Sequence, residues 1–359
     1  MRQINNMSIE RKNKTMLFPR IGRFIIIFFA IALIFVGIRA YRLYQYAFRD
    51  NVKRDYVLII PDNFTYQLLL DKLIQNDVLE SYKAFNWVSK KKSYKKTVKP
   101  GRYELKKGMN TNEVVNILRS GLQDPVNVTF NNCRFKEDLA GKVSKYIQAD
   151  SLSILNLFYD EKQIEEYGFT TETYRAMFIP NTYEFYWTTS AEEFAVRMKK
   201  EYERFWNEER KQKAESINLT PVEVTILASI VQSETAKKDE LKTVAGLYIN
   251  RLNRGQPLQA DPTVKYAVGN FSLKRILNSH LEIDSPYNTY KYAGLPPGPI
   301  NFPEISSIDA VLNYEKHNYI YMCAKEDFSG YHNFSRTLAE HNINAAKYRA
   351  ALNENKIYN

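Results

Sequence analysis

The feature that most constrains this sequence is an apolar run close to its N-terminus. Fifteen uncharged and almost wholly apolar residues extend from Phe24 to Ile38. A bilayer core requires ~20 residues, but the flanking apolar residues and the long side chains of Arg23 and Arg39 can extend the span. The sequence therefore predicts a single transmembrane helix over residues 17–41.

The charges around this run predict its orientation. Six lysines and arginines precede Phe24, against a single acid, Glu10. The positive-inside rule places residues 1–16 in the cytoplasm as a short tail and exports everything after about Tyr44 from the plasma membrane. A cleaved secretory signal is the alternative, but the exit "VGIRAYRLYQYAF" is bulky and basic and lacks an A-x-A site. Both interpretations export the rest of the chain, which argues against nucleic acid as a partner despite the net charge of +11.

The exported part predicts an α+β protein with two domains. Residues 42–54 are polar and indicate a stalk. Residues 55–124 contain a strand, two helices and a second strand that follows the turn Pro100-Gly101, a β-α-α-β unit of about the size of a small peptidoglycan-binding module. A short helix then begins with Asn110 or Thr111 as its N-cap and ends at Gly121. Residues 125–355 form a second, mixed α+β domain, in which "AEEFAVRMKKEYERFWNEERKQKAE" predicts one long charged helix.

The stretch "ILASIVQSETA" places a carboxylate in an unusual position. Residues 220–223, Thr-Pro-Val-Glu, start the helix with a capping box and proline at the first helical position. Along that helix Leu227, Ile230 and Val231 share one face, and Glu234 lies in line with them. A carboxylate on an apolar face loses hydration, which raises its pKa toward the value that a general acid needs near neutral pH.

A purely structural role for Glu234 is the alternative. In that case the carboxylate lies at a boundary and pairs with Lys237, Lys238 or Arg251. The next helix, "DELKTVAGLYINRLNRG", carries a second apolar stripe and ends at Gly255. The two helices therefore present Glu234 near their junction, and periodicity alone leaves both roles open.

Three downstream stretches favour a functional role. "QADPTVKYAVG", "DSPYNTYKYAGLPPGPINFP" and "GYHNF" are rich in Pro, Gly, Tyr, Asn and Thr, the composition of rigid loops that line a site and stack on sugars. Together with "IVQSETA" and "AGLYINRL", they resemble the YceG-like (MltG) family of membrane-anchored endolytic murein transglycosylases. The resemblance covers the whole architecture and is strongest from Leu227 to Phe334. It implies that residues 55–124 are a LysM-like peptidoglycan-binding module and that residues 125–355 are the catalytic domain.

The resemblance implies roles for particular residues. The catalytic glutamate of the family falls on Glu234, and Gln232 stands where many relatives have a second glutamate, which leaves Glu234 as the only carboxylate in the motif. The resemblance also implies a set of substrate-binding residues: Arg251, Gln259, Asp261, Thr263, Tyr287, Asn288, Tyr290, Pro297 and His332.

The reaction that the resemblance implies needs neither a metal nor a cofactor. Glu234 protonates the oxygen of the β-1,4 bond between N-acetylmuramic acid and N-acetylglucosamine in nascent peptidoglycan. The resulting carboxylate takes the proton from the C6 hydroxyl, which attacks C1 and closes a 1,6-anhydro ring. Ordinary glycosidases use two carboxylates, whereas an intramolecular nucleophile of high effective molarity replaces the second one here. The implied partners are glycan strands, the membrane, peptidoglycan synthases and division proteins.

Three other interpretations remain open from sequence. Asp261 is a candidate second carboxylate for a hydrolase, although its position before Pro262 favours capping of a turn or helix start. A second alternative is a non-catalytic peptidoglycan-binding scaffold. A third is a cysteine hydrolase that uses Cys323 and His332, although "YIYMCA" predicts a buried strand with an inert thiol. Cys133 and Cys323 could also pair, which sequence does not decide.

Overall fold

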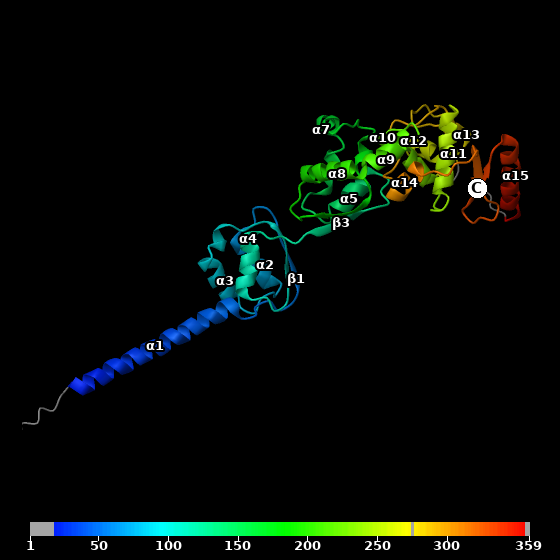
Figure 1. Cartoon of the computed structure of the whole chain (residues 1–359). Helices are drawn as coiled ribbons and strands as arrows, with labels where there is room; N and C mark the ends of the chain where they lie inside the picture. Colours follow the sequence, from blue (N-terminus) through cyan, green and yellow to red (C-terminus); the bar gives the residue numbers. More distant parts are fainter. Residues whose placement is uncertain (1–17, 274–275, 356–359) are drawn as a thin grey trace, which may run out of the picture. The chain divides into compact units, whose positions relative to one another are not determined.

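A computed structural model describes residues 18–273 and 276–355 and shows a mixed α+β protein (Figure 1). The predicted cytoplasmic tail, residues 1–16, lies outside the described residues. The chain forms two compact units, of which the first ends at Asp124 and the second begins at Pro125. Each unit has its own hydrophobic core.

The first element is a long apolar helix, α1 (Phe18–Phe48). Its segment Gly22–Phe48 is long and apolar enough to cross a membrane, and an 18-residue window within it has a mean hydropathy of 2.5 and no buried residue. Such a helix fits a single-pass anchor or a signal sequence. The helix continues through the first part of the segment predicted as a stalk, where Ala47 packs against the core of the first unit. Residues after the helix also join that unit, since Asp50 and Val52 form backbone bridges to Asn110 and Leu79.

The rest of the first unit has the β-α-α-β order predicted from sequence. Its elements are β1 (Tyr56–Ile60), α2 (Tyr66–Gln75), α3 (Tyr82–Lys91), the 3-10 helix η1 (Tyr94–Lys96), β2 (Gly101–Leu105) and α4 (Thr111–Ser120). The strands pair antiparallel, with Tyr56 opposite Leu105. The predicted ends of α4 are confirmed: Asn110 forms a capping box, and Gly121 adopts φ 74°, where a side chain would be strained.

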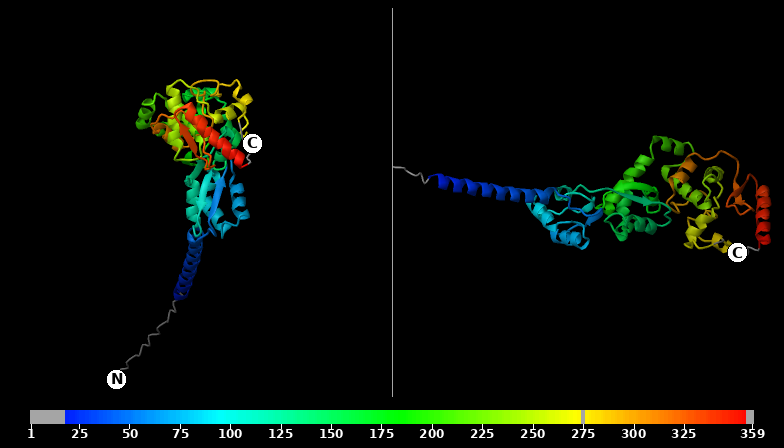
Figure 2. Two further views of the ribbon diagram at one scale, coloured as in Figure 1. Left: turned by 90° about the vertical axis from the view of Figure 1, so that its right-hand side faces the viewer. Right: turned by 90° about the horizontal axis from the view of Figure 1, so that it is seen from below.

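The second unit combines helices with two antiparallel strand pairs. The strands are β3 (Val126–Phe130), β4 (Asn181–Phe185), β5 (Tyr321–Ala324) and β6 (His332–Ser335). They pair as β3 with β4 and β5 with β6. The helices are α5 (Lys136–Val143), α6 (Ser151–Asn156), α7 (Glu161–Glu166), η2 (Tyr174–Met177), α8 (Ala191–Phe205), α9 (Glu208–Glu215), α10 (Pro221–Glu234), α11 (Leu241–Asn253), α12 (Asp261–Val268), α13 (Asn278–Leu281), α14 (Ile305–Leu312) and α15 (Leu338–Glu354). Helix α15, red in Figure 2, packs beside β5 and β6.

Three expectations about local structure were wrong. The charged segment 191–215 is two helices, because the fully buried Trp206 ends α8 and Asn207 caps α9 by accepting a hydrogen bond from the Arg210 backbone N–H. The stretch 259–269, read as a rigid loop, contains helix α12, which ends at Gly269. The strand that contains Cys323 is half-buried rather than buried.

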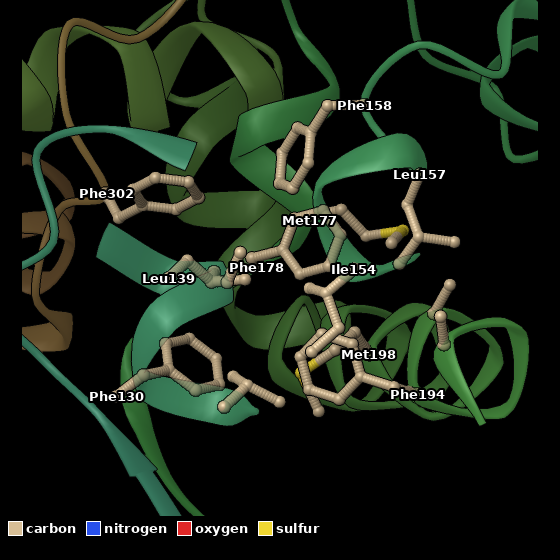
Figure 3. Close-up of a cluster of buried hydrophobic side chains, with 14 of the residues drawn as sticks. Phe130, Leu139, Ile154, Leu157, Phe158, Met177, Phe178, Phe194, Met198 and Phe302 are labelled. Atoms are coloured by element: carbon tan, nitrogen blue, oxygen red, sulfur yellow. The ribbon is translucent and has the colours of Figure 1, made fainter. Parts of the chain in front are cut away.

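Two hydrophobic cores stabilise the second unit, and one loop links them. The first core is rich in aromatic residues from β3, β4, α8 and η2 (Figure 3). Phe302 enters this core, and its ring centroid lies 6.3 Å from that of Phe158 and 6.5 Å from that of Phe178. Ile300, two residues earlier, packs in the second core, which surrounds α10 and α11. The loop at 300–302 is therefore held on both sides, next to the end of α10.

Candidate active site

Helix α10 carries Glu234 at its last residue. The predicted start is confirmed, because the Thr220 hydroxyl accepts from the Glu223 N–H, the Glu223 carboxylate accepts from the Thr220 N–H, and Pro221 occupies the first turn. All eight residues from Val224 to Val231 are buried. The helix is thus enclosed on every side rather than amphipathic, which is expected for an apolar helix inside a core. Its rigid packing fixes the position of the Glu234 carboxylate.

The surroundings of Glu234 favour its protonated form. Desolvation by the protein raises the pKa of Glu234 to about 7, and the negative charge of Asp261 adds to the rise. The O–H of Tyr248, on α11, donates a hydrogen bond to Glu234 Oε1 at 2.7 Å, which lowers the pKa, as does the positive charge of Lys265. Burial has the larger effect, so the carboxyl exchanges its proton near neutral pH.

The structural alternative for Glu234 finds no support in the described residues. No lysine or arginine among them lies within ion-pair distance of its carboxylate. Lys237, one of the proposed partners, instead lies over the Tyr331 ring, 4.6 Å from its centroid. The guanidinium of Arg251, another proposed partner, donates hydrogen bonds to backbone carbonyls instead. A desolvated carboxyl without a neutralising cation is typical of a catalytic acid.

Glu234 lies where two hollows in the surface meet. The first, of about 720 Å³, runs from Arg134 and Phe135 past Asn301 to Glu234. The second, of about 440 Å³, runs from Tyr321 and His332 to Glu234. Asp261 also lines both hollows. A chain-like ligand that occupies both hollows therefore passes the two carboxyl groups.

Asp261 does not have the capping role expected from the sequence. It is the first residue of α12, whose N-cap position is Ala260. Its side chain is exposed, and its Oδ1 accepts a hydrogen bond from the Tyr290 O–H at 2.6 Å. This contact fixes the orientation of both side chains at the junction of the hollows.

Three more of the predicted substrate-binding residues line the second hollow. The buried guanidinium of Arg251 donates to the carbonyls of Pro257 (2.9 Å) and Ile320 (2.7 Å) and to the Gln259 side chain. These bonds connect the end of α11 to β5, which is a structural task besides any contact with a ligand. His332 is bound on its backbone N–H and on Nδ1 by the carboxylate of Glu240, at 2.7 and 3.0 Å.

The other four predicted residues do not line either hollow. Thr263 and Asn288 are fully buried. The Thr263 hydroxyl donates to the Ala260 carbonyl and shares a hydrogen bond with the Thr289 hydroxyl. The Asn288 side-chain amide donates to the carbonyls of Leu281 and Ile283. The Tyr287 ring packs against that of Tyr266 at 4.7 Å. Pro297 lines a separate hollow together with Leu219 and Ile249. Thr263 and Asn288 support the loops that carry Asp261 and Tyr290.

Gln232 has a structural role. Its Oε1 accepts hydrogen bonds from the Glu304 N–H (2.6 Å) and the Ser307 hydroxyl (3.1 Å), at the start of α14. Because these contacts hold α14 against α10, Gln232 helps to fix the loop at 300–302. A glutamate at this position would meet the same two donors.

Sequence reasoning missed three residues of the site. Tyr248 was read as part of an apolar stripe, and its hydroxyl gave no sign of a partner 14 residues earlier. Glu240 was not singled out in the sequence, but it is buried and also accepts from the Thr235 hydroxyl at 3.0 Å. His341, on α15, lines the second hollow and stacks on Tyr321 at 5.4 Å. A polar residue within an apolar pattern is the only signal that could have indicated them.

The cysteines are separate thiols. Cys133 and Cys323 are both unpaired. Burial raises the pKa of the Cys323 thiol, which opposes formation of a nucleophilic thiolate. In the antiparallel register Cys323 lies opposite Asn333 and His332 lies opposite Ala324, so their side chains leave opposite faces of the strand pair. Among the described residues no group of three or more His, Cys, Asp or Glu side chains is arranged to hold a metal ion.

Comparisons with known proteins identify the family of the chain. The model of the YceG-like family matches residues 58–347. The endolytic murein transglycosylase of Bacillus subtilis is 31% identical over 314 residues, which cover 82% of this chain and 85% of that protein. The Streptococcus pneumoniae protein of the same name is 27% identical, over 90% of this chain and 65% of its own length.

A solved structure is also similar. The crystal structure of a yceG-like protein from Listeria monocytogenes has 28% sequence identity and a TM-score of 0.53, and the match covers 81% of this chain and 98% of that one. The family match spans both units, including Glu234, Tyr248, Asp261 and His332. The chain therefore belongs to the YceG-like family.

Proposed function

We propose that this protein is an endolytic lytic transglycosylase of peptidoglycan. The observation that carries the proposal is the position of Glu234, a carboxyl with a pKa of about 7 at the junction of two hollows. Endolytic cleavage requires room for sugars on both sides of the bond that breaks, and the two hollows provide it. The relatives named as endolytic murein transglycosylases support the substrate class.

The hydrogen bond from Tyr248 organises the proton transfer. Because the Tyr248 O–H donates to Oε1 of Glu234, Oε2 is left to carry the acidic proton. That proton passes to the oxygen of the β-1,4 bond between N-acetylmuramic acid and N-acetylglucosamine as positive charge develops on C1. The carboxylate formed then takes the proton of the C6 hydroxyl, whose oxygen attacks C1 and gives a 1,6-anhydro end. Tyr248 stabilises Glu234 in its ionised stage, and desolvation stabilises the protonated stage.

Asp261 supports the same reaction through its charge. Its carboxylate raises the pKa of Glu234 and lines the same two hollows, so it attracts positive charge that develops on the sugar. A hydrolase would need Asp261 to activate water with Oδ2, since the Tyr290 O–H occupies Oδ1, whereas an intramolecular C6 hydroxyl needs no second base. We therefore assign Asp261 to electrostatic stabilisation. Anhydro ends in the product agree with this assignment, whereas reducing ends would contradict it.

The walls of the hollows suit a glycan. The second hollow presents Tyr290, Tyr321, His332 and the guanidinium of Arg251, which combine aromatic faces for sugar rings with hydrogen-bond donors and acceptors. The first presents Phe135 and Phe271, whose ring centroids lie 4.9 Å apart. We assign Arg251, Gln259, Tyr290 and His332 to substrate binding.

We also propose that α1 is an uncleaved anchor, with the N-terminus cytoplasmic and both units outside. The C-terminal end of α1 packs against the first unit, because Ala47 contacts its core and the Tyr46 ring lies 6.2 Å from that of Trp87. From the β-α-α-β order of its elements, we propose that this unit contains a LysM-like module that binds peptidoglycan. A non-catalytic scaffold would need only this module.

One experiment separates the enzyme from the scaffold. Purified sacculi are digested with the full chain in detergent, wild type beside Glu234→Gln, and the products are identified by mass spectrometry. We expect anhydro ends from the wild type, loss of cleavage in the variant and unchanged sacculus binding in both. Cleavage that persists in the variant would refute the assignment of the acid. Glu165→Gln, an exposed glutamate on α7, is the matched control and should cleave like the wild type.

A further inference from the structure

The positive charge of the protein is unevenly distributed. Residues 42–124 contain sixteen lysines and arginines against nine acids, a net charge of +7. Residues 125–359 contain 28 against 30, a net charge of −2. The basic surplus outside the N-terminal tail therefore belongs to the first unit and not to the unit that carries Glu234. A function for this charge must be sought beside α1.

One face of α3 concentrates unpaired lysines. Lys83, Trp87, Lys90 and Lys91 lie at helical spacings that bring them to the same side. The three lysines are exposed, and none forms an ion pair with another residue of the described chain. Lys91 Nζ lies 5.9 Å from the centroid of the Trp87 ring. We call these four residues the α3 basic face.

Helix α3, which carries the α3 basic face, lies beside the C-terminal end of α1 (Figure 1). Helix α1 packs against α3 and α4, and the rings of Tyr46 and Trp87 are in edge contact at 6.2 Å. From Tyr41, the last residue of the predicted transmembrane helix, to Tyr46 an α-helix rises only about 7.5 Å. A lipid headgroup layer extends about 5–7 Å beyond the hydrocarbon core. If α1 crosses a membrane, Trp87 and the neighbouring lysines lie at the level of the headgroups.

We propose that the α3 basic face binds the anionic phosphate headgroups of the membrane that α1 crosses. The inference rests on the proposed anchor but not on the proposed reaction. Lysine is suited to phosphate as a point charge, and its attraction is strongest within a Debye length of ~8 Å. Trp87 and the exposed Tyr41 and Tyr44 supply aromatic rings of the kind that gather at membrane interfaces. Binding would hold the first unit against the lipid surface as well as tethering it.

Hydrogen–deuterium exchange of the full chain in nanodiscs tests the proposal. Exchange of α3 amides is compared in zwitterionic phosphatidylcholine discs and in discs that contain phosphatidylglycerol. We expect the α3 amides to exchange at least about fivefold more slowly in anionic discs. Fivefold is about the effect of a single lysine on binding to an anionic surface. The triple variant K83Q/K90Q/K91Q should lose this difference. K145Q/K162Q/K200Q, which neutralises three exposed lysines of the second unit, is the matched control and should keep it.

Additional arms identify the source of any protection. Soluble glycerol phosphate polymer or glycan strands are added to zwitterionic discs. Protection of α3 by either one, without a response to phosphatidylglycerol, would overturn the proposal in favour of a wall polymer. Equal exchange in both disc types would also overturn it. The triple variant must exchange like the wild type in zwitterionic discs, which shows that α3 is folded. Because exchange is measured without glycan cleavage, failure here is distinct from failure of the proposed reaction.

Discussion

Replacement of Glu234 by glutamine should stabilise the protein at alkaline pH. The pKa of Glu234 is raised from 4.5 to about 7 by folding. The folded protein therefore binds this proton more tightly than the unfolded chain does. The favourable contribution to the free energy of unfolding is complete below about pH 4.5 and is lost as the pH rises through about 7. Glutamine stays neutral at every pH and still offers an oxygen to the Tyr248 O–H.

The size of the effect follows from the shift in pKa. A rise from 4.5 to about 7 corresponds to about 3 kcal/mol at pH values well above 7. Because Glu234 lines two hollows and remains partly accessible to water, solvent screening reduces this value. We expect Glu234→Gln to raise the free energy of unfolding by about 2 kcal/mol at pH 8 and to leave it unchanged at pH 4.

Urea unfolding of the full chain in detergent, followed by tryptophan fluorescence between pH 4 and pH 9, measures the difference. The exposed Glu165→Gln serves as the control and should show no pH-dependent gain. A variant that is as stable as the wild type at pH 4 and less stable at pH 8 would refute the reasoning, because it would mean that folding favours the ionised carboxylate.

Other contacts at the site give three further predictions. Tyr248→Phe removes a hydrogen bond to the ionised Glu234, so the alkaline limb of the pH–rate profile for glycan cleavage should move up by about 1–2 units; an unmoved limb would mean that the bond does not stabilise the carboxylate. The double variant Gln232→Glu/Glu234→Gln should remain inactive in the sacculus assay, since a carboxylate at position 232 meets two donors that keep it ionised; recovered anhydro products would contradict this. Glu240→Gln weakens the bonds to His332 and should lower the free energy of unfolding by about 1–3 kcal/mol in urea titrations, whereas wild-type stability would show that these bonds are dispensable.

Local signals in the sequence predicted local structure well. The start of α10 at Thr220 and both ends of α4 were predicted because a capping group and its N–H partners lie within one helical turn. The apolar helix α1 followed from hydropathy over successive residues. Failures came where distant residues decide: the buried Trp206 divided a helix that composition predicted as continuous, and α12 formed in a segment rich in loop-forming residues.

The sequence by itself determined that Glu234 lies in an apolar environment, which is a property of its own helix. Only the tertiary structure decided what surrounds its carboxyl. Tyr248 comes from the next helix, and the two hollows are built from segments up to about a hundred residues away. The predicted binding residues divided in the same way, with Asp261 and Tyr290 at the junction and Thr263 and Asn288 buried beneath it. The two groups are alike in residue type and spacing, so the sequence does not distinguish them. Their exposure depends on which face the folded chain covers.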